Sequence, residues 1–436
     1  MQSSYKQILR LALPIMGASL AQNLVSLIDT AFLGLLGQTE LAAGGIGVLF
    51  FLTIGFVGLG LGTGVQVLSA QLLGADRAKE LSALLRQSLW IGGAVGLLLT
   101  MGVIASVPSL LPLLLHDIET IHTTTVFLQG RSLELPALIL FGILRGYYSG
   151  TAQTSFILQA NLLLASINLL LNALFVIGLE WGLKGVIAGS VLSQYLATAY
   201  LFWALTRQAY RLEGGASAGL WIKPLFRYAG PAVLQHLIGM AGWVFFFLLI
   251  ERRGQFALAA ANIVRSLYSF CMLPTWAFST AVGTLTGFFW GAKDRPNLVA
   301  ALRRALVLSQ GLNILICIGL IGCAPLIVQI FTKDIALQVQ VRQDLWIIGI
   351  SLILMPPSAL LLSAVVGVGR VVQAFLVEVG IILLYVGYAS SMDQMSVSLT
   401  WMWSAEWVYW IPSAGVLYFL WRRQIERLSR VSLVLS

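Results

Sequence analysis

The stretch LALPIMGASLAQNLVSLIDTAFLGLL, residues 11–36, is apolar along almost its whole length and contains a single acid, Asp29. A helix needs about 20 apolar residues to cross a bilayer, so this stretch is long enough to span one. It is much longer than the apolar region of a secretory signal peptide, and no small-residue cleavage site interrupts it. We therefore predict a retained membrane span that carries a carboxyl group.

The composition extends this prediction to the rest of the chain. Of the 436 residues, 58% are hydrophobic and 10% are charged, whereas a soluble domain has about 25% charged residues. The mean hydropathy is +0.90. The three cysteines lie in apolar segments without metal-ligand spacing and suggest no disulfide framework. No catalytic motif is present, so we expect no enzyme and no cofactor.

Apolar runs recur along the whole chain, and we predict an all-α membrane protein with twelve spans. Their approximate limits are 9–36, 44–73, 85–107, 124–147, 156–178, 185–206, 226–250, 259–290, 301–323, 340–366, 370–389 and 403–422. Most of the 26 Lys and Arg residues fall in alternate short loops. Because positive charge is retained on the cytoplasmic side, we expect a multi-pass protein with both termini in the cytoplasm. The net charge of +9 is explained by this pattern, so we expect no nucleic-acid partner.

The sequence repeats itself after a shift of 217 residues. The shift aligns Pro14 with Pro231, GQ at 37–38 with GQ at 254–255, and DI at 117–118 with DI at 334–335. Each half then has six spans, so the repeat is parallel, and such halves usually face each other across a central cleft. We predict an N-terminal lobe over 1–206, a polar cytoplasmic linker over 207–225 and a C-terminal lobe over 226–436.

Several segments resemble one transporter family. These are the first span, GTGVQVLSAQLLGAD at 62–76, INLLLNALFVIGL at 167–179 and GLKGVIAG at 182–189. Together with the twelve-span repeat, they resemble the multidrug and toxic compound extrusion (MATE) family of the MOP flippase superfamily, and its DinF-like branch in particular. The resemblance implies a bacterial inner-membrane protein that exports organic, often cationic compounds in exchange for H⁺ or Na⁺.

The resemblance also implies a cation or proton site in the N-terminal lobe. Its positions correspond here to Asp29, Asn168, Asn172 and Ser190. Asn172 stands where the family usually has Asp, so one carboxylate is missing. Na⁺ at Asp29, Asn168 and Asn172 remains an alternative, but the missing charge favours H⁺. The acids that the NorM-like branch uses in spans 7 and 10 are also absent, which supports the DinF-like assignment.

The residues themselves point to the same region. An ionised Asp at bilayer depth costs about 2.5 kcal/mol or more, so Asp29 must face protein or water. Polar residues also recur at helical spacing on three spans: Gln22 and Ser26 with Asp29, Asn161 with Asn168 and Asn172, and Gln194 with Ser190. Stripes facing lipid would leave amides without partners, so we expect them to converge inside the N-terminal lobe. Gln22, Ser26, Asn161 and Gln194 are accordingly candidates for the polar lining, although such residues also join helices without further function.

Two further patterns allow structural explanations. GLGLGTG at 58–64 resembles a phosphate-binding loop but lacks the G-K-[ST] ending, so we interpret it as small residues for helix packing. In the second half, His236, Arg265 and Glu378 are candidate site residues. Arg265 could instead form a structural ion pair with Glu378 or Glu406, and His236 could be a packing residue.

We therefore predict a secondary antiporter for amphipathic organic compounds. It works by rocking alternating access with Asp29 as the coupling acid, and we expect a monomer in the bilayer. The alternative is a flippase for lipid-linked sugars or other lipids of the same superfamily. Such proteins often carry several cations in the cavity, and the central spans here offer mainly Arg265.

Overall fold

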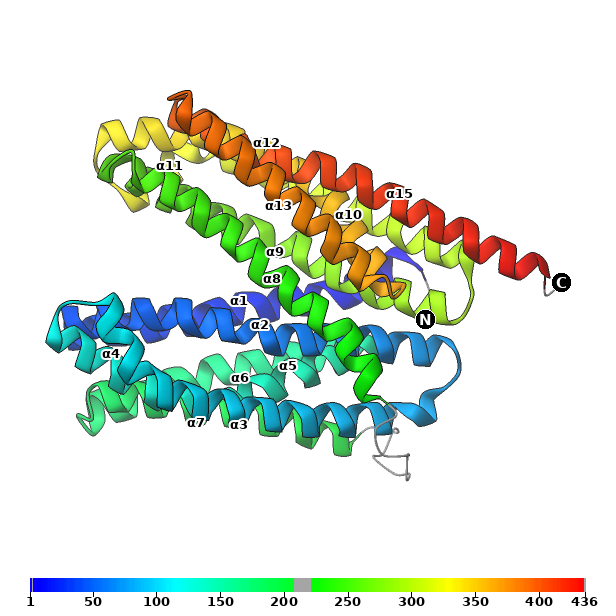
Figure 1. Ribbon diagram of the computed structural model, residues 1–436, viewed down its shortest axis with the longest axis horizontal. Helices are drawn as coiled ribbons and strands as arrows, with labels where there is room; N and C mark the ends of the chain where they lie inside the picture. The colour runs from blue at the N-terminus through cyan, green and yellow to red at the C-terminus, as the bar shows by residue number, and fades with distance from the viewer. Residues whose placement is uncertain (2, 208–220, 435–436) are drawn as a thin grey trace. The chain divides into compact units, whose positions relative to one another are not determined.

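The computed structural model describes residues 1, 3–207 and 221–434, and these residues are almost entirely helical (Figure 1). The helices are α1 (Tyr5–Leu36), α2 (Gln38–Gly74), the short η1 (Ala78–Glu80), α3 (Leu81–Leu114), α4 (Ile118–Ser132), α5 (Leu135–Gly150), α6 (Thr154–Asn172) with its π-helical extension η2 (Ala173–Gly178), α7 (Leu183–Thr206), α8 (Ile222–Glu251), α9 (Gln255–Gly291), α10 (Arg295–Gly322), α11 (Ala324–Phe331), α12 (Ile335–Gly367), α13 (Val371–Gln394), α14 (Leu399–Met402) and α15 (Ala405–Val434). The all-α prediction is confirmed.

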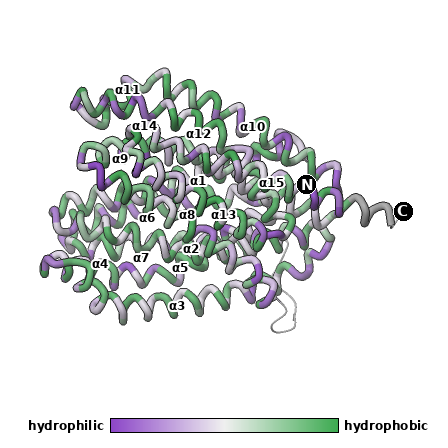
Figure 2. Tube along the Cα trace, turned by 45° about the horizontal axis from the view of Figure 1, so that its top comes forward, coloured by the Kyte–Doolittle hydropathy of each residue, from purple (hydrophilic) through white to green (hydrophobic). Residues whose placement is uncertain are grey.

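Ten of these helices are long and apolar enough to cross a membrane, and the count rises to eleven if α4 and α5 form one bent span. Figure 2 shows hydrophobic residues along most of the helices. Large apolar side chains such as Leu98, Leu113 and Leu170 are 63–76% exposed, as expected where lipid replaces water around the protein. The predicted span at 124–147 is broken in two, and the one at 403–422 lies in α15, which is not among the eleven.

The chain divides into two compact units. One, called here the N-unit, comprises residues 14–72 and 76–233, and the other, the C-unit, comprises 1–13, 73–75 and 234–436. The N-unit thus includes the start of α8, and the C-unit includes the first residues of α1. Residues 208–220, most of the predicted linker, lie outside the described residues, and the predicted lobe limits stay a prediction.

The internal repeat appears in the backbone as well as in the sequence. Asp76 and Lys293, 217 residues apart, both have positive φ, of 59° and 55°. Asp117 caps the N-terminus of α4, and its counterpart Asp334 caps α12 in the same way. Each aspartate accepts hydrogen bonds from backbone N–H groups of the first turn, which would otherwise be unsatisfied. The two halves therefore share local structure at the positions that the shift of 217 aligns.

Glycines bring α2 and α5 into backbone contact within the N-unit. A Cβ atom at Gly146 would lie 2.0 Å from the carbonyl oxygen of Gly62, and one at Gly142 would lie 2.6 Å from that of Gly58. Only glycine permits this approach, because any side chain would overlap the facing backbone. The packing interpretation of residues 58–64 is therefore confirmed.

Candidate functional site

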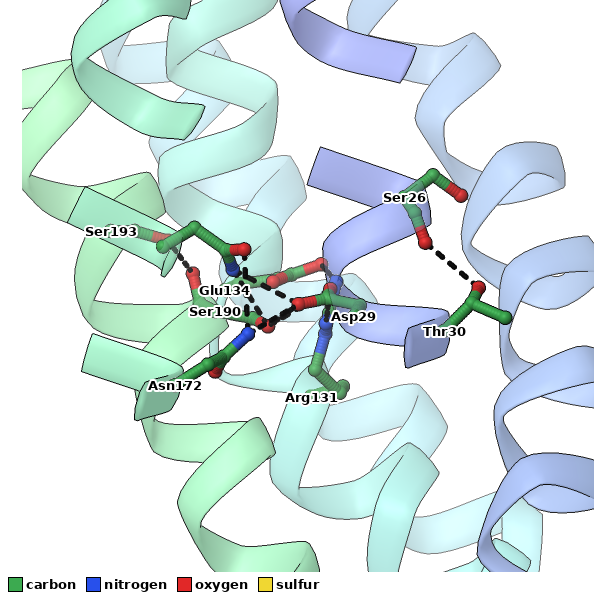
Figure 3. Close-up of polar contacts among 9 residues, drawn as sticks. Ser26, Asp29, Thr30, Arg131, Glu134, Asn172, Ser190 and Ser193 are labelled. Carbon is green, nitrogen blue, oxygen red and sulfur yellow. Dashed lines mark hydrogen bonds and ion pairs between the residues drawn. The ribbon is translucent and has the colours of Figure 1, made fainter. Parts of the chain in front are cut away.

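The N-unit contains a polar cluster around Asp29, which is 8% exposed (Figure 3). The carboxylate oxygen Oδ1 accepts hydrogen bonds from the amide groups of Asn168 at 3.0 Å and Asn172 at 2.9 Å. The Ser190 hydroxyl lies 3.0 Å from both carboxylate oxygens. The structure thus brings together four residues that the sequence analysis assigned to one site, from α1, α6 and α7.

A cation that the sequence analysis did not assign to this site completes the cluster. Nη1 of Arg131 donates to Oδ2 of Asp29 at 2.7 Å, and Nη2 donates to Oε1 of Glu134 at 3.0 Å. The side chains of these three residues are only 7–14% exposed. Arg131 therefore links the two acids as a buried ion-pair triad, and it compensates the charge that would otherwise make Asp29 costly at this depth.

The triad lies at the break between α4 and α5, where the chain bends by 48°. Pro136 at the start of α5 has no N–H, so the carbonyl of Ser132 four residues earlier loses its helical donor. The hydroxyl of Thr100 on α3 replaces that donor at 2.9 Å, and Tyr195 on α7 donates to the next carbonyl, of Leu133, at 3.0 Å. Side chains thus satisfy the backbone that the break leaves open.

Aromatic rings surround the guanidinium. It lies 5.6 Å from the ring centre of Phe51 and 5.9 Å from that of Phe127, distances at which a ring face attracts a cation. Nε of Arg131 is buried and has no hydrogen-bond partner among the described residues. The two terminal nitrogens therefore bind the acids, one nitrogen for each.

The other predicted lining residues lie elsewhere. Gln22 and Ser26 are exposed, and the Ser26 carbonyl accepts from Thr30 on the far side of α1 from the triad (Figure 3). Asn161 is buried, but its amide donates to Ile157 within its own helix. Gln194 is also buried, and its side-chain nitrogen has no partner in the described part of the chain. The three stripes thus meet at Asp29, Asn168, Asn172 and Ser190. A lining role for Gln22, Ser26, Asn161 and Gln194 stays a prediction.

In the C-unit, the described residues show no ion pair for Arg265, whose guanidinium lies 5.2 Å from the ring centre of Phe247. Glu406 instead accepts from the Tyr268 hydroxyl and the Trp410 indole, at 3.0 and 3.1 Å. Neutral donors thus satisfy this buried acid. They also explain why no cation is needed beside it.

Of the other two C-unit candidates, Glu378 adjoins that cluster through Tyr409, whose ring centre lies 4.5 Å from that of Trp410. Glu378 accepts a hydrogen bond of 2.5 Å from Tyr409. His236 is half-buried on α8. Both residues belong to the C-unit, whereas the triad belongs to the N-unit, so the cluster around Asp29 is the better-defined site.

Together, long apolar helices, an internal repeat and a buried charged cluster are typical of a polytopic membrane transporter. A family model described as MatE matches residues 14–174 and 231–388, one segment in each half. The chain belongs to the MatE family, whose members are transporters and not enzymes.

Relatives and solved structures agree with this assignment. The chain is 27% identical over 347 residues to "Probable multidrug resistance protein NorM" of Synechocystis sp., covering 72% of this chain and 69% of that protein. It is 25% identical over 345 residues to the protein of the same name from Thermotoga maritima, covering 76% and 72%. The structure matches one titled "Outward-facing conformation of a multidrug resistance MATE family transporter of the MOP superfamily" with TM-score 0.91, 20% identity, and coverage of 99% and 97%. The DinF-like branch stays a prediction.

Proposed function

We propose that this protein is a secondary active antiporter that exports amphipathic, often cationic organic compounds in exchange for H⁺ or Na⁺. Membership of the MatE family and the names of the relatives support export of such compounds. The observation that carries the antiport proposal is Asp29, a buried acid within apolar helices and surrounded by polar partners. A buried ionisable group in a membrane span is by default a functional group.

Asp29 couples ion movement to export because it binds or releases the ion according to which side of the membrane the site is open to. The acid takes up the ion when the site is open to one side of the membrane and releases it when the site is open to the other side. If the two repeats rock to expose the site alternately to each side, ion release and substrate capture become linked. Asn168, Asn172 and Ser190 hold the charged form through the hydrogen bonds described above.

We place the protein in the inner membrane of a bacterium, with both termini in the cytoplasm, as a monomer. The excess of Lys and Arg in alternate loops supports this orientation. No cofactor is required, because the free energy comes from the ion gradient.

The test uses purified protein in liposomes loaded with a fluorescent organic cation. A pH gradient and a Na⁺ gradient are imposed separately, and protein-free liposomes serve as the control. Acceleration of cation movement by one gradient supports antiport. Movement that is unaffected by either gradient contradicts it, and translocation of a lipid-linked sugar instead would favour the flippase.

A further inference from the structure

The triad has an odd number of charges. Asp29 and Glu134 are negative and Arg131 is positive, so the ionised cluster carries one net negative charge. The other groups that contact Asp29 are neutral: the amides of Asn168 and Asn172 from α6 and the hydroxyl of Ser190 from α7. From α2, the ring of Phe51 faces the guanidinium. One added proton therefore makes the cluster neutral.

The directions of the hydrogen bonds favour H⁺ over Na⁺. Oδ1 of Asp29 accepts from two amide N–H groups and from Ser190, and Oδ2 accepts from Arg131. These donors point at the carboxylate oxygens that a metal ion would need as ligands, and a guanidinium has no acceptor atom to offer it. Na⁺ would also have to approach a fixed positive charge bound at 2.7 Å from the carboxylate. A proton can add to the carboxylate without expelling Arg131, because the guanidinium keeps its second acid.

Arg131 divides its two terminal nitrogens between the acids. Nη1 binds Asp29 and Nη2 binds Glu134. Protonation of Asp29 weakens the first bond, since the carboxylate loses its charge, and leaves the second intact. Arg131 then pairs with Glu134 alone. The guanidinium is thus a permanent counter-ion whose pairing changes with the occupancy of Asp29.

We infer that Arg131 and Glu134 are positioning residues that restrict the coupling site to one proton per cycle and exclude Na⁺, with Arg131 shifting from Asp29 toward Glu134 when the proton binds. This inference rests on the proposed antiport. Arg131 lies in the last turn of α4 and Glu134 precedes α5, so the shift acts directly on the 48° break between them. The break is held by backbone hydrogen bonds such as that from the Glu134 N–H to the Arg131 carbonyl, and by the side chains that bind its carbonyls. A shift of Arg131 acts on these bonds.

The second half of the chain has no equivalent of the Asp29–Arg131–Glu134 triad at the aligned positions. A shift of 217 aligns Asp29, Arg131 and Glu134 with Phe246, Ile348 and Ser351, none of which is charged. The corresponding helix α12 also continues without a break from Ile335 to Gly367. The triad is therefore a feature of the N-unit and not a requirement of the repeated fold.

The test measures protonation directly, by infrared titration of the carboxylic acid band in purified protein in lipid. Asp29→Asn identifies the band. In Glu134→Gln, Arg131 pairs with Asp29 alone, so the midpoint of the Asp29 titration moves to lower pH. Arg131→Gln removes the counter-ion, so the midpoint moves to higher pH. Each shift is about one pH unit or more, the usual effect of a charge at this distance. The exposed acid Glu119 on the same helix gives the matched control Glu119→Gln, with no shift expected.

Transport assays test the exclusion of Na⁺. The double variant Arg131→Gln with Glu134→Gln keeps one net negative charge but has no counter-ion, so we expect export to respond to a Na⁺ gradient, unlike the native protein. Arg131→Lys keeps the charge and is expected to restore the native ion preference.

Opposite shifts in the infrared titration support the inference, and shifts of the same sign or no shift overturn it. Native export driven by Na⁺ also overturns it. If Arg131→Gln does not fold, Glu134→Gln, which is close in shape, still decides the sign. If the native protein exports no organic cation, the proposed function fails, whereas the infrared titration still tests the triad.

Discussion

Substitution of Gly146 by Ala should destabilise the protein more than its one added methyl group suggests. Gly146 on α5 faces the backbone of α2, and the new Cβ atom would lie 2.0 Å from the carbonyl oxygen of Gly62. Ordinary contact for such an atom begins at 3.4 Å. Neither atom belongs to a flexible side chain, so the two helices must move apart by about 1 Å or more.

The expected magnitude is a difference between two terms. Overpacking of a close-packed interface costs about 1–3 kcal/mol. Replacing glycine by alanine within a helix contributes about 0.5–1 kcal/mol in favour of folding. The net loss of stability then lies between about 0 and about 2.5 kcal/mol, and the short 2.0 Å approach places it toward the upper end. A Cβ atom added at Gly93 on α3 would meet no described atom within 4 Å, so Gly93→Ala should retain only the favourable term.

The assay is the thermal unfolding midpoint of purified protein in one detergent, measured for the native chain and both variants. We expect a lower midpoint for Gly146→Ala and an equal or higher midpoint for Gly93→Ala. Equal midpoints for the two variants would refute the argument that α2 and α5 are in backbone contact.

Three further predictions use the same assay. Thr100→Val removes the hydroxyl that binds a free carbonyl at the α4–α5 break, so unfolding should become easier by about 1–3 kcal/mol, and an unchanged midpoint would contradict this role. Tyr268→Phe removes a donor from buried Glu406 and should cost about as much; a stabilised variant would show that the bond is not needed. In the loop before α4, the Thr120 hydroxyl and backbone N–H lower the pKa of Asp117. A lowered pKa gives stability that is present above the unfolded-state pKa and lost as pH falls through the folded-state pKa. The midpoint difference between native protein and Asp117→Ala should therefore shrink as the pH falls below the ordinary carboxyl pKa of 3.8. A pH-independent difference would exclude the charged cap.

The fold was largely predictable because its signals are local or periodic. Long apolar runs located the spans, and the alignment of Pro14 with Pro231 revealed the repeat. Proline within a predicted span indicates an interruption or kink, and this signal is correct at Pro136, where the chain bends by 48°. The same signal at other prolines does not distinguish a break from a continuous helix, since membrane helices often continue through proline. Indeed Pro274 lies within α9 and the Pro356–Pro357 pair within α12, both continuous helices.

The site was predictable only in part. Asp29 could be identified because an acid in an apolar run needs a partner, and its resemblance-derived partners Asn168 and Asn172 do contact it. The sequence did not identify Arg131 as a site residue, because Arg131 lies 102 positions from Asp29 and at the edge of a span. Its signal was the pairing with Glu134 three residues later, shortly before a proline. Gln22, by contrast, lies at helical spacing from Asp29 but is exposed. Residues repeated at this spacing cover a broad arc of the helix surface, and the contact at Asp29 occupies only part of that arc.

The most direct test of the central claim compares native protein with Asp29→Asn in liposomes, with export of a fluorescent organic cation driven by a pH gradient. Thr30→Val is the matched control, because Thr30 is the next residue on α1, is exposed and hydrogen-bonds within its own helix. We predict that Asp29→Asn abolishes gradient-driven export while Thr30→Val keeps it. Full gradient-driven export by folded Asp29→Asn would contradict the assignment of Asp29 as the coupling acid.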